Sequence, residues 1–350
     1  MLPQFSYVRP ATIEQAITHL KSGDATVHAG GTDLLGCLRE RIISSREIVS
    51  ISGLKDLAGI KETADGGVII GALTTITEIS NNPIIINKYP GLAQGAAEVA
   101  SPQLRNQGTL GGNLCQKPRC WYYRGEFHCL RKGGDICFAM NGENQFHAIF
   151  GHDHICAITH PSDTAPNLVA LGAAVQVVGP KGKRSIKVEE LHVLPVDDVQ
   201  ADTVLKQDEL ITHISVPPPP VGLYSSYRKV RARRSWDFAL AGVALALVVK
   251  DNKVSQANVI LSGAAPVPWR STEAEKVIEG KKLTADIIDL AARAAVATAT
   301  PLAKNGYKVD MFRGVLMEEL GKGRYKIYTK AILGACAPLE QLLNFYSERL

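Results

Sequence analysis

The sequence predicts an α+β protein built from more than one globular unit, and three observations support this fold class. The chain has 350 residues with 45% hydrophobic content, enough to bury two or three cores. Helix-type and strand-type patterns follow one another in both halves of the chain. Four consecutive prolines within 216–222 can continue neither a helix nor a strand, so the main linker is expected there.

The N-terminal unit is expected to combine a helix with strands. Residues 12–21 carry apolar side chains at the spacing of an amphipathic helix, and Thr12 with Gln15 forms a capping box. The apolar runs 25–29 and 47–51 predict strands. This order indicates a small α+β unit at the start of the chain.

A second, larger unit is expected before the linker. A strand is predicted at 67–73, a helix begins within 74–79, and 89–99 is helical. Three further runs bounded by glycine, proline and lysine also predict strands. These runs are 168–179, 184–191 and 209–217.

The region after the linker predicts a small α+β domain of three strands followed by helices. Residues 224–263 have strand-type patterns with a hairpin turn at 251–253. Thr272 with Glu275 is expected to cap the first helix, and 285–297 forms the second.

Two glycine-rich turns are candidate binding sites for an anion. They are AGGTDLL at 29–35 and TLGGNL at 109–114. Glycine permits close backbone approach, so successive N–H groups can converge on a pyrophosphate, and the first turn directly follows a predicted strand. The motifs G-x-G-x-x-G and G-x-x-x-x-G-K-[ST] are both missing, which disfavours a Rossmann dehydrogenase and an ordinary NTPase.

Five of the seven cysteines lie within residues 101–163, and four of them follow the spacing C-x8-C-x7-C-x18-C. These four are Cys120, Cys129, Cys137 and Cys156. Four thiolates suit a four-iron four-sulfur cluster or a tetrahedral zinc ion. Zinc sites usually contain close C-x2–4-C pairs, which this segment lacks, so the spacing favours iron and sulfur. Disulfides are disfavoured because no secretory segment is present.

Charge and hydropathy exclude two classes of partner. The net charge is +5, but lysine and arginine are scattered and form no stripe suited to nucleic acid. No run of 18 apolar residues predicts a membrane span, and no signal peptide pattern opens the chain. The expected compartment is the cytoplasm, or the periplasm if the folded subunit is exported with a partner that carries a twin-arginine signal.

A resemblance to a known family rests on four motifs read together: AGGTDLL, RNQGTLGGNL, HPSD and YRKVRARRSWDFALAGVA. With these motifs, nearly the whole chain resembles the FAD-binding medium subunit of the molybdenum hydroxylases, the xanthine dehydrogenase and carbon monoxide dehydrogenase family. Most members lack the cysteine-rich insertion. The chain with it is similar to the flavoprotein subunits of 4-hydroxybenzoyl-CoA reductase and bacterial periplasmic aldehyde oxidoreductase, whose loop holds an extra [4Fe–4S] cluster.

The resemblance implies a two-part FAD-binding domain like that of vanillyl-alcohol oxidase, an iron–sulfur loop inserted at about 116–158, and a C-terminal domain with a three-stranded sheet and helices. The implied boundaries are 1–57 and 58–222 for the two FAD-binding subdomains and 223–350 for the C-terminal domain with its tail. The last helix of the tail, 339–350, is expected to pack on that domain or on a partner.

The resemblance also implies which residues contact FAD. They are Ala29, Gly30, Gly31, Thr32, Asp33, Leu34, Ser101, Thr109, Gly111, Gly112, Asn113, Asp163, Ile211 and Lys229. Amides of the first turn would bind the pyrophosphate, while Asp163 would accept from ribose or adenine, or simply cap the next segment. Lys229 would lie near the flavin carbonyls, with an ordinary surface lysine as the alternative, and Ile211 would pack on the cofactor.

Cys115 is left out of the cluster ligands because it lies in the turn that simpler family members share, and we expect it buried near the flavin. His152 or His154 replacing Cys156 is the alternative ligand set. The isolated thiols, Cys37 and Cys336, are expected in the core.

The function implied is electron transfer. The resemblance implies a heterotrimer in which a large molybdenum-cofactor subunit performs the substrate chemistry and a small subunit carries two [2Fe–2S] clusters, with a dimer of heterotrimers as one possible assembly. This chain would pass electrons between those clusters and an external carrier through FAD and the [4Fe–4S] cluster. The alternatives are a zinc-stabilised scaffold without flavin and a flavin oxidase of the vanillyl-alcohol type.

Overall fold

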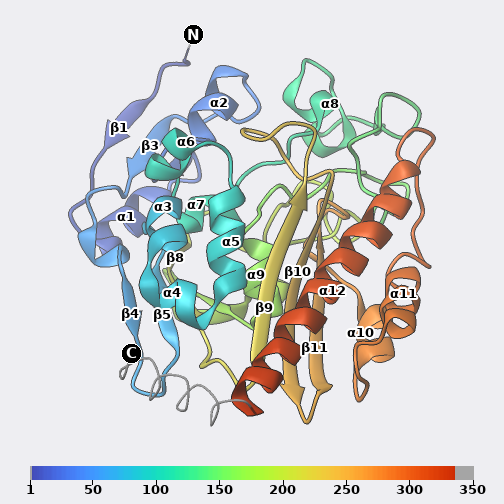
Figure 1. The fold of residues 1–350 in the computed structure, drawn as a ribbon. Helices are drawn as coiled ribbons and strands as arrows, with labels where there is room; N and C mark the ends of the chain where they lie inside the picture. The colour runs from blue at the N-terminus through green and yellow to red at the C-terminus, as the bar shows by residue number, and fades with distance from the viewer. Residues whose placement is uncertain (1, 336–350) are drawn as a thin grey trace.

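The computed structural model describes residues 2–335, which form three sheets with helices packed between and around them (Figure 1). Cys336 and the helix predicted at 339–350 lie outside the described residues. Within 2–335, no helix is both long and apolar enough to cross a bilayer.

The chain begins with a three-stranded parallel sheet in the order β1-β3-β2. Its elements are β1 (Ser6–Val8), α1 (Ile13–Leu20), β2 (Ala25–His28), α2 (Leu34–Arg39) and β3 (Glu47–Ser50). The Thr12 hydroxyl accepts from the Gln15 amide as predicted, but the Gln15 side chain accepts from the Ala11 amide and not from Thr12, so the capping box is only half formed. Buried Ala16, Ile17 and Leu20 then pack α1 against the sheet.

The second sheet has five antiparallel strands in the order β4-β5-β8-β6-β7. The strands are β4 (Ile60–Glu62), β5 (Val68–Gly71), β6 (Ala174–Gly179), β7 (Gly182–Lys187) and β8 (Leu210–Val216). Packed with them are α3 (Ile76–Asn81), α4 (Pro83–Lys88), α5 (Pro90–Glu98) and α9 (Ala165–Ala170), while short 3-10 turns occupy Lys55–Leu57 and Val188–Glu190.

Two strand predictions in this sheet are wrong in extent. Residues 168–170 belong to helix α9, and the strand begins only at Ala174. All of α9 is buried between the second sheet and the C-terminal domain, so its apolar run has neither helical nor strand periodicity. The strand predicted at 184–191 ends at Lys187, where the 3-10 turn begins.

The cysteine-rich segment contains little regular structure. Its elements are α6 (Pro102–Gln107), α7 (Leu110–Leu114), α8 (Trp121–Arg124) and a 3-10 turn at Leu130–Lys132. In Figure 1, α6 and α7 lie beside α3 and α5, whereas α8 lies at the top of the molecule, and the loops after it reach the start of α12 (Tyr307–Ala335). Side-chain contacts and isolated backbone hydrogen bonds hold these loops in place, such as those of the Ile149 and His160 amides to the carbonyls of Ala264 and Ala265.

The C-terminal sheet is antiparallel with the order β12-β11-β10-β9. Its elements are β9 (Leu223–Val230), β10 (Ala241–Lys250), β11 (Lys253–Ser262), β12 (Trp269–Arg270), α10 (Thr272–Ile278) and α11 (Ala285–Ala294). The predicted hairpin turn holds Asp251 and Asn252 at φ 52° and 59°, as a two-residue turn of type I′ requires. The two-residue strand β12 adds a fourth member to the predicted three.

The cap predicted for α10 is wrong by one residue. Thr272 is the first helical residue, and Ser271 occupies the N-cap without accepting a hydrogen bond there. Glu275 instead turns to the sheet, where it accepts from the Val259 amide and pairs with Arg270 at 3.0 Å. A tertiary contact has replaced the local one.

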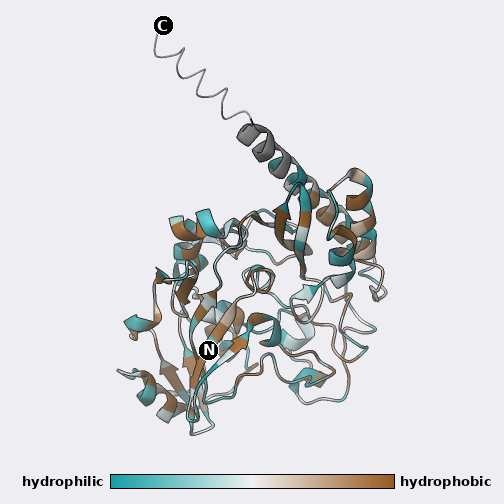
Figure 2. Cartoon of the chain, turned by 90° about the horizontal axis from the view of Figure 1, so that it is seen from below, coloured by the Kyte–Doolittle hydropathy of each residue, from teal (hydrophilic) through white to brown (hydrophobic). Residues whose placement is uncertain are grey.

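Strand β10 is buried on both faces and joins the domains. Ala244 and Ala246 face the core formed with α5 and α9, whereas Leu245 and Leu247 face α12 and its neighbouring helices. Figure 2 shows the hydrophobic residues, in brown, concentrated on the strands and the helix faces turned toward them. The C-terminal domain therefore shares a continuous core with the second sheet.

Removing the Leu247 side chain tests the core on the other face of β10, between the C-terminal sheet and its helices. Leu247 is 0% exposed, so Leu247→Ala should lower the free energy of unfolding by about 2–5 kcal/mol through lost transfer energy and a cavity. Leu290→Ala on α11, where the side chain is 50% exposed, is the control. Urea denaturation of both variants measures the difference. Equal denaturation midpoints would contradict the placement of Leu247 in the core.

Candidate functional site

A cleft of about 510 Å³ lies between the first sheet and the second. Both glycine-rich turns line it, together with the segment 200–211 that leads into β8. Its size falls in the range of small-molecule and cofactor sites. The predicted contacts that line it are Ala29, Gly30, Gly31, Thr32, Asp33, Leu34, Thr109, Gly111, Gly112 and Ile211.

The first turn links the end of β2 to α2 and leaves its amides available. Gly31 has φ +74°, a conformation that glycine adopts at little cost. A Cβ atom on Gly30 would lie 2.0 Å from the carbonyl oxygen of Gln107, so the turn packs directly on the chain just before the second turn. Among the described residues, no acceptor pairs with the amides of Gly30, Gly31, Thr32 or Asp33. These amides can therefore bind an anion in the cleft.

The second turn uses its own amides for structure. The Gly111 amide donates to the Ala72 carbonyl at 2.9 Å, and the Gly112 amide donates to the Thr109 hydroxyl at 3.3 Å. This turn can offer a ligand close approach over bare glycine backbone, while its hydrogen-bonding capacity is already occupied. The two turns, similar in sequence, are thus chemically different.

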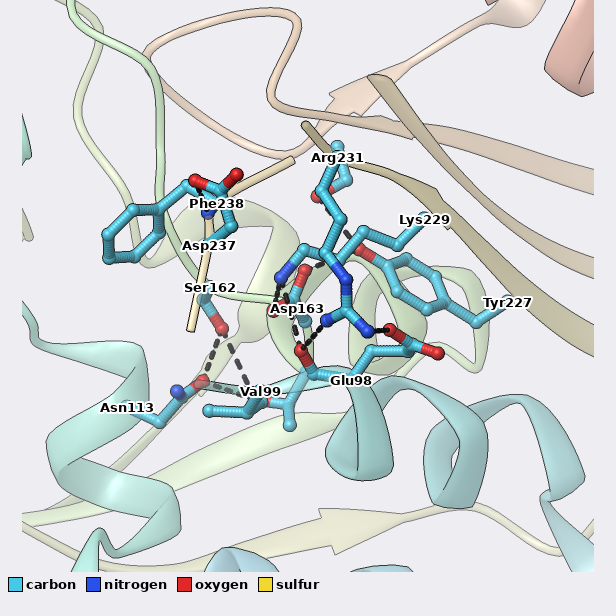
Figure 3. Close-up of polar contacts among 12 residues, drawn as sticks. Glu98, Val99, Asn113, Ser162, Asp163, Tyr227, Lys229, Arg231, Asp237 and Phe238 are labelled. Atoms are coloured by element: carbon cyan, nitrogen blue, oxygen red, sulfur yellow. Dashed lines mark hydrogen bonds and ion pairs between the residues drawn. The ribbon is translucent and has the colours of Figure 1, made fainter. Parts of the chain in front are cut away.

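Four predicted contacts do not line the cleft, and two of them serve local structure. Ser101 caps α6 by accepting from the Leu104 amide at 3.4 Å. The Asn113 side-chain oxygen accepts from the hydroxyls of Ser162 and Thr164, which ties the second turn to the HPSD segment (Figure 3). Their contact with FAD stays a prediction.

The other two, Asp163 and Lys229, form a buried ion pair. Lys229 Nζ lies 2.7 Å from Asp163 Oδ2, and the Tyr227 hydroxyl donates to Asp163 Oδ1 at 2.7 Å (Figure 3). Lys229 also donates to the carbonyl oxygen of Glu98 at 3.1 Å. Burial raises the pKa of the Asp163 carboxyl, and the Lys229 ammonium opposes that rise. Lys229 is therefore not a surface lysine, and it connects β9 to α5 and the HPSD segment.

Asp33 has a role that sequence reasoning missed: it holds the cysteine-rich segment. Its carboxylate lies 2.8 Å from the guanidinium groups of both Arg119 and Arg124 and accepts from the Lys117 amide at 2.8 Å. The closely spaced basic residues of KPRCWYYR were the available signal, but their acidic partner lies about eighty positions earlier. The first turn thus positions both the cleft and the segment beside it.

The four predicted cysteine ligands line one small cavity. Its lining includes Cys120, Cys129, Cys137 and Cys156 with His147 and the apolar residues Phe138, Ala139 and Ile158. A hydrogen bond between two of the thiols lowers the pKa of Cys137 to about 6 and raises the pKa of Cys156. In the described part of the chain, no three histidine, cysteine or acidic side chains are grouped closely enough to hold a single metal ion.

Cys37, Cys115 and the two histidines considered as alternative ligands lie outside the cysteine cavity. Cys115, which is partly buried, and Cys37, which is buried, line the large cleft, and the closeness of Cys115 to the flavin stays a prediction. His152 Nε2 contacts the Thr300 carbonyl at 2.8 Å, and neither His152 nor His154 lines the cysteine cavity. The arrangement gives no support to a histidine in place of Cys156.

The fold and these cavities define a two-domain α+β protein with a cofactor-sized cleft and a thiol-lined cavity beside it. Residues 3–219 match the family described as the FAD binding domain in molybdopterin dehydrogenase, and residues 225–322 match the CO dehydrogenase flavoprotein C-terminal domain. The chain belongs to the family of FAD-binding medium subunits of the molybdenum hydroxylases.

Individual relatives agree with this assignment. The chain is 34% identical to the aldehyde oxidoreductase FAD-binding subunit PaoB of Escherichia coli (strain K12), a match covering 91% of this chain and 98% of that protein. It is 27% identical to the carbon monoxide dehydrogenase medium chain of Hydrogenophaga pseudoflava, with 85% and 88% covered. A solved structure of carbon monoxide dehydrogenase from that organism has a TM-score of 0.72 at 25% identity, covering 91% of this chain and 96% of that one.

These matches confirm the family and the fold class expected from the sequence. They identify the chain as an FAD-binding oxidoreductase subunit of multi-subunit molybdenum hydroxylase complexes.

Gly30→Ala should weaken FAD binding by at least about tenfold, or roughly 1.4 kcal/mol. The added methyl group would collide with the Gln107 carbonyl and move the turn whose amides face the cleft. Gly36→Ala on α2 is the matched control, since a Cβ there meets nothing within 4 Å. Titration of the deflavinated protein with FAD measures both, and equal affinities would contradict the role assigned to the first turn.

Lys229→Met should lower the free energy of unfolding by about 3–5 kcal/mol, because it leaves the Asp163 carboxylate buried without its cation. The double variant Asp163→Asn with Lys229→Met removes both charges and should recover more than half of that loss. Denaturation of the flavin-free protein separates this effect from cofactor binding. A double variant as unstable as the single one would show that the ion pair does not account for the loss.

Proposed function

We propose that this chain is the FAD- and [4Fe–4S]-carrying electron-transfer subunit of a heterotrimeric molybdenum hydroxylase. The observation that carries the proposal is the presence of two neighbouring cavities in one chain, one lined by a glycine turn with unpaired amides and one lined by four cysteines. FAD exchanges two electrons and can release them singly, which matches one-electron clusters to two-electron chemistry.

In this proposal the first turn holds the pyrophosphate of FAD through the amides of Gly30 to Asp33. Thr109, Gly111 and Gly112 approach the cofactor from the opposite side of the cleft, and Ile211 packs against it. The remaining proposed contacts, which bond to other parts of the protein in the structure, are Ser101, Asn113, Asp163 and Lys229.

The cysteine cavity fits an iron–sulfur cluster by the chemistry of its donors. Four thiols with an apolar surround are the complement for a [4Fe–4S] cluster, and Cys120, Cys129, Cys137 and Cys156 are the proposed ligands. The open volume among them is only about 10 Å³. Cluster binding must therefore replace the Cys137–Cys156 hydrogen bond and move the thiols outward.

An ion pair connects the walls of the two cavities, which supports their acting together. Asp202 lines the large cleft, Arg131 lines the cysteine cavity, and the Arg131 guanidinium donates to the Asp202 carboxylate. Arg131 also donates to the carbonyls of Val199 and Ala201 at 2.7 and 2.8 Å. This ion pair brings one residue from each cavity wall into contact, which supports electron exchange between the groups that the two cavities would hold.

The proposed partners are a large molybdenum-cofactor subunit, a small subunit with two [2Fe–2S] clusters and an external electron carrier. A dimer of heterotrimers is one proposed assembly of the subunits. Related medium subunits belong to an aldehyde oxidoreductase, a carbon monoxide dehydrogenase and a nicotine 6-hydroxylase. We propose an aldehyde, N-heterocycle or aromatic acyl-CoA as the substrate of the complex, and the cytoplasm, or the periplasm after co-export, as its location.

We further propose that 1–57 and 58–222 are the two FAD-binding subdomains and that 223–350 is the C-terminal domain with its tail. The first boundary falls between the three-stranded and five-stranded sheets, and the second falls between β8 and β9.

Cys129→Ser tests the cluster. The purified variant complex should keep its FAD but lose at least half of the iron and acid-labile sulfide that belong to the proposed [4Fe–4S] cluster. The reason is that serine is a poorer ligand for iron than cysteine. Cys115→Ser, which lies at the cleft and outside the cysteine cavity, should keep the full content. A colourless protein with stoichiometric zinc would instead identify the scaffold alternative, and turnover by the isolated chain would identify a flavin oxidase.

A further inference from the structure

Lys308, in the first turn of α12, is a buried cation without a counter-ion. Lys308 is 0% exposed to solvent. The ammonium donates to two backbone carbonyls, that of His147 at 3.0 Å and that of Gly263 at 2.6 Å. Among the side chains that the structure describes, no carboxylate forms an ion pair with it. Carbonyl oxygens satisfy its hydrogen bonds but leave its charge uncompensated.

Two further features make this an unfavourable place for a positive charge. The N-terminal end of a helix carries a partial positive charge of its own, and Lys308 lies in the first turn of a 29-residue helix. Burial lowers the pKa of the Lys308 ammonium to about 7. A lysine held in such surroundings is explained by a nearby anion.

The cysteine cavity is the neighbouring place where an anion would form. His147, whose carbonyl binds Lys308, lines that cavity, and its Nε2 atom lies 3.2 Å from the Cys120 sulfur. Asn305, one turn before Lys308, donates to the carbonyls of His147 and Ala148 at 3.1 and 3.0 Å. The start of α12 is therefore bonded directly to the cavity wall.

The cation that lines this cavity is already neutralised. Arg131 lines the cavity, but its guanidinium is paired with the Asp202 carboxylate. Lys308, bonded to the cavity wall through the His147 carbonyl and without a carboxylate among the described side chains, can therefore balance charge at the four thiolates.

We propose that Lys308 is the positioning residue that supplies the counter-charge for the cluster bound by the four cysteines and raises its reduction potential. This inference rests on the proposed [4Fe–4S] cluster. Four thiolates and a doubly positive iron–sulfur core carry a net charge of about −2, and one electron makes it about −3. A fixed cation nearby stabilises the more negative, reduced state more than the oxidised state.

The test is a potentiometric titration of the assembled complex followed by electron paramagnetic resonance of the reduced cluster. Lys308→Gln keeps a donor for the two carbonyls and removes the charge. At the midpoint potential of the unmodified cluster, the ratio of reduced to oxidised cluster should fall at least tenfold, which corresponds to about 59 mV for a one-electron couple.

The matched control is Lys304→Gln. Lys304 precedes the same helix and pairs with Glu143, but its side chain is 49% exposed, so solvent screens its charge. In Lys304→Gln, the ratio of reduced to oxidised cluster at the same potential should change less than twofold. FAD content and iron content should equal those of the unmodified complex in both variants.

The outcomes separate the two proposals. An unmodified complex without iron and acid-labile sulfide overturns the proposed cluster, whereas a cluster with the same potential in Lys308→Gln overturns only the role of Lys308. If Lys308→Gln does not fold, Lys308→Met is measured in its place. If neither variant folds but Lys308→Arg folds with the reduction potential of the unmodified cluster, the result supports a requirement for positive charge at this position. If all three variants fail to fold, Lys308 is purely structural and the inference is wrong.

Discussion

The close approach of Gly30 to the Gln107 carbonyl is the constraint on which the rest of this structure depends. No side chain fits between them, since even a Cβ atom would lie 2.0 Å from that oxygen. The contact sets the first sheet against the segment that leads into the second turn, and the large cleft opens between them. Three residues further on, Asp33 holds the cysteine-rich segment through Arg119 and Arg124. One short turn therefore positions both candidate cofactor sites.

Buried charges connect the parts of the molecule that strands do not. Lys229 and Asp163 join the C-terminal sheet to the HPSD segment, and Arg131 and Asp202 join the cysteine-rich segment to the wall of the cleft. A buried charge is costly unless it is paired, so each pair restricts how its two segments can pack. Lys308 differs because its described partners are only carbonyl groups, and it lies beside the thiol-lined cavity. The Arg131–Asp202 pair between the two candidate sites is therefore balanced, whereas the charge of Lys308 beside the thiol-lined cavity is not balanced by a described carboxylate.

Features encoded by neighbouring residues were predictable. The helix beginning after Thr12, the hairpin turn at 251–253 and the two glycine turns depend on contacts within a few positions, and the structure contains each of them. The errors occur where distant contacts override a local pattern. Residues 168–170 belong to a helix that is buried on all sides, so their apolar run lacks the helical period, and Glu275 binds the Val259 amide and Arg270 in place of a helix cap.

The sequence by itself determined the family, the division into α+β units and, among the residues that line the two cavities, the glycine turns and the four cysteines, because motif spacing and periodicity are local properties of the chain. Only the tertiary structure decided what each polar group binds. Two similar glycine turns differ in their free amides, Lys229 is paired inside the protein, and Lys308 is left without a carboxylate. Partners of buried charges lie tens to hundreds of residues apart in the sequence, so no local pattern can name them.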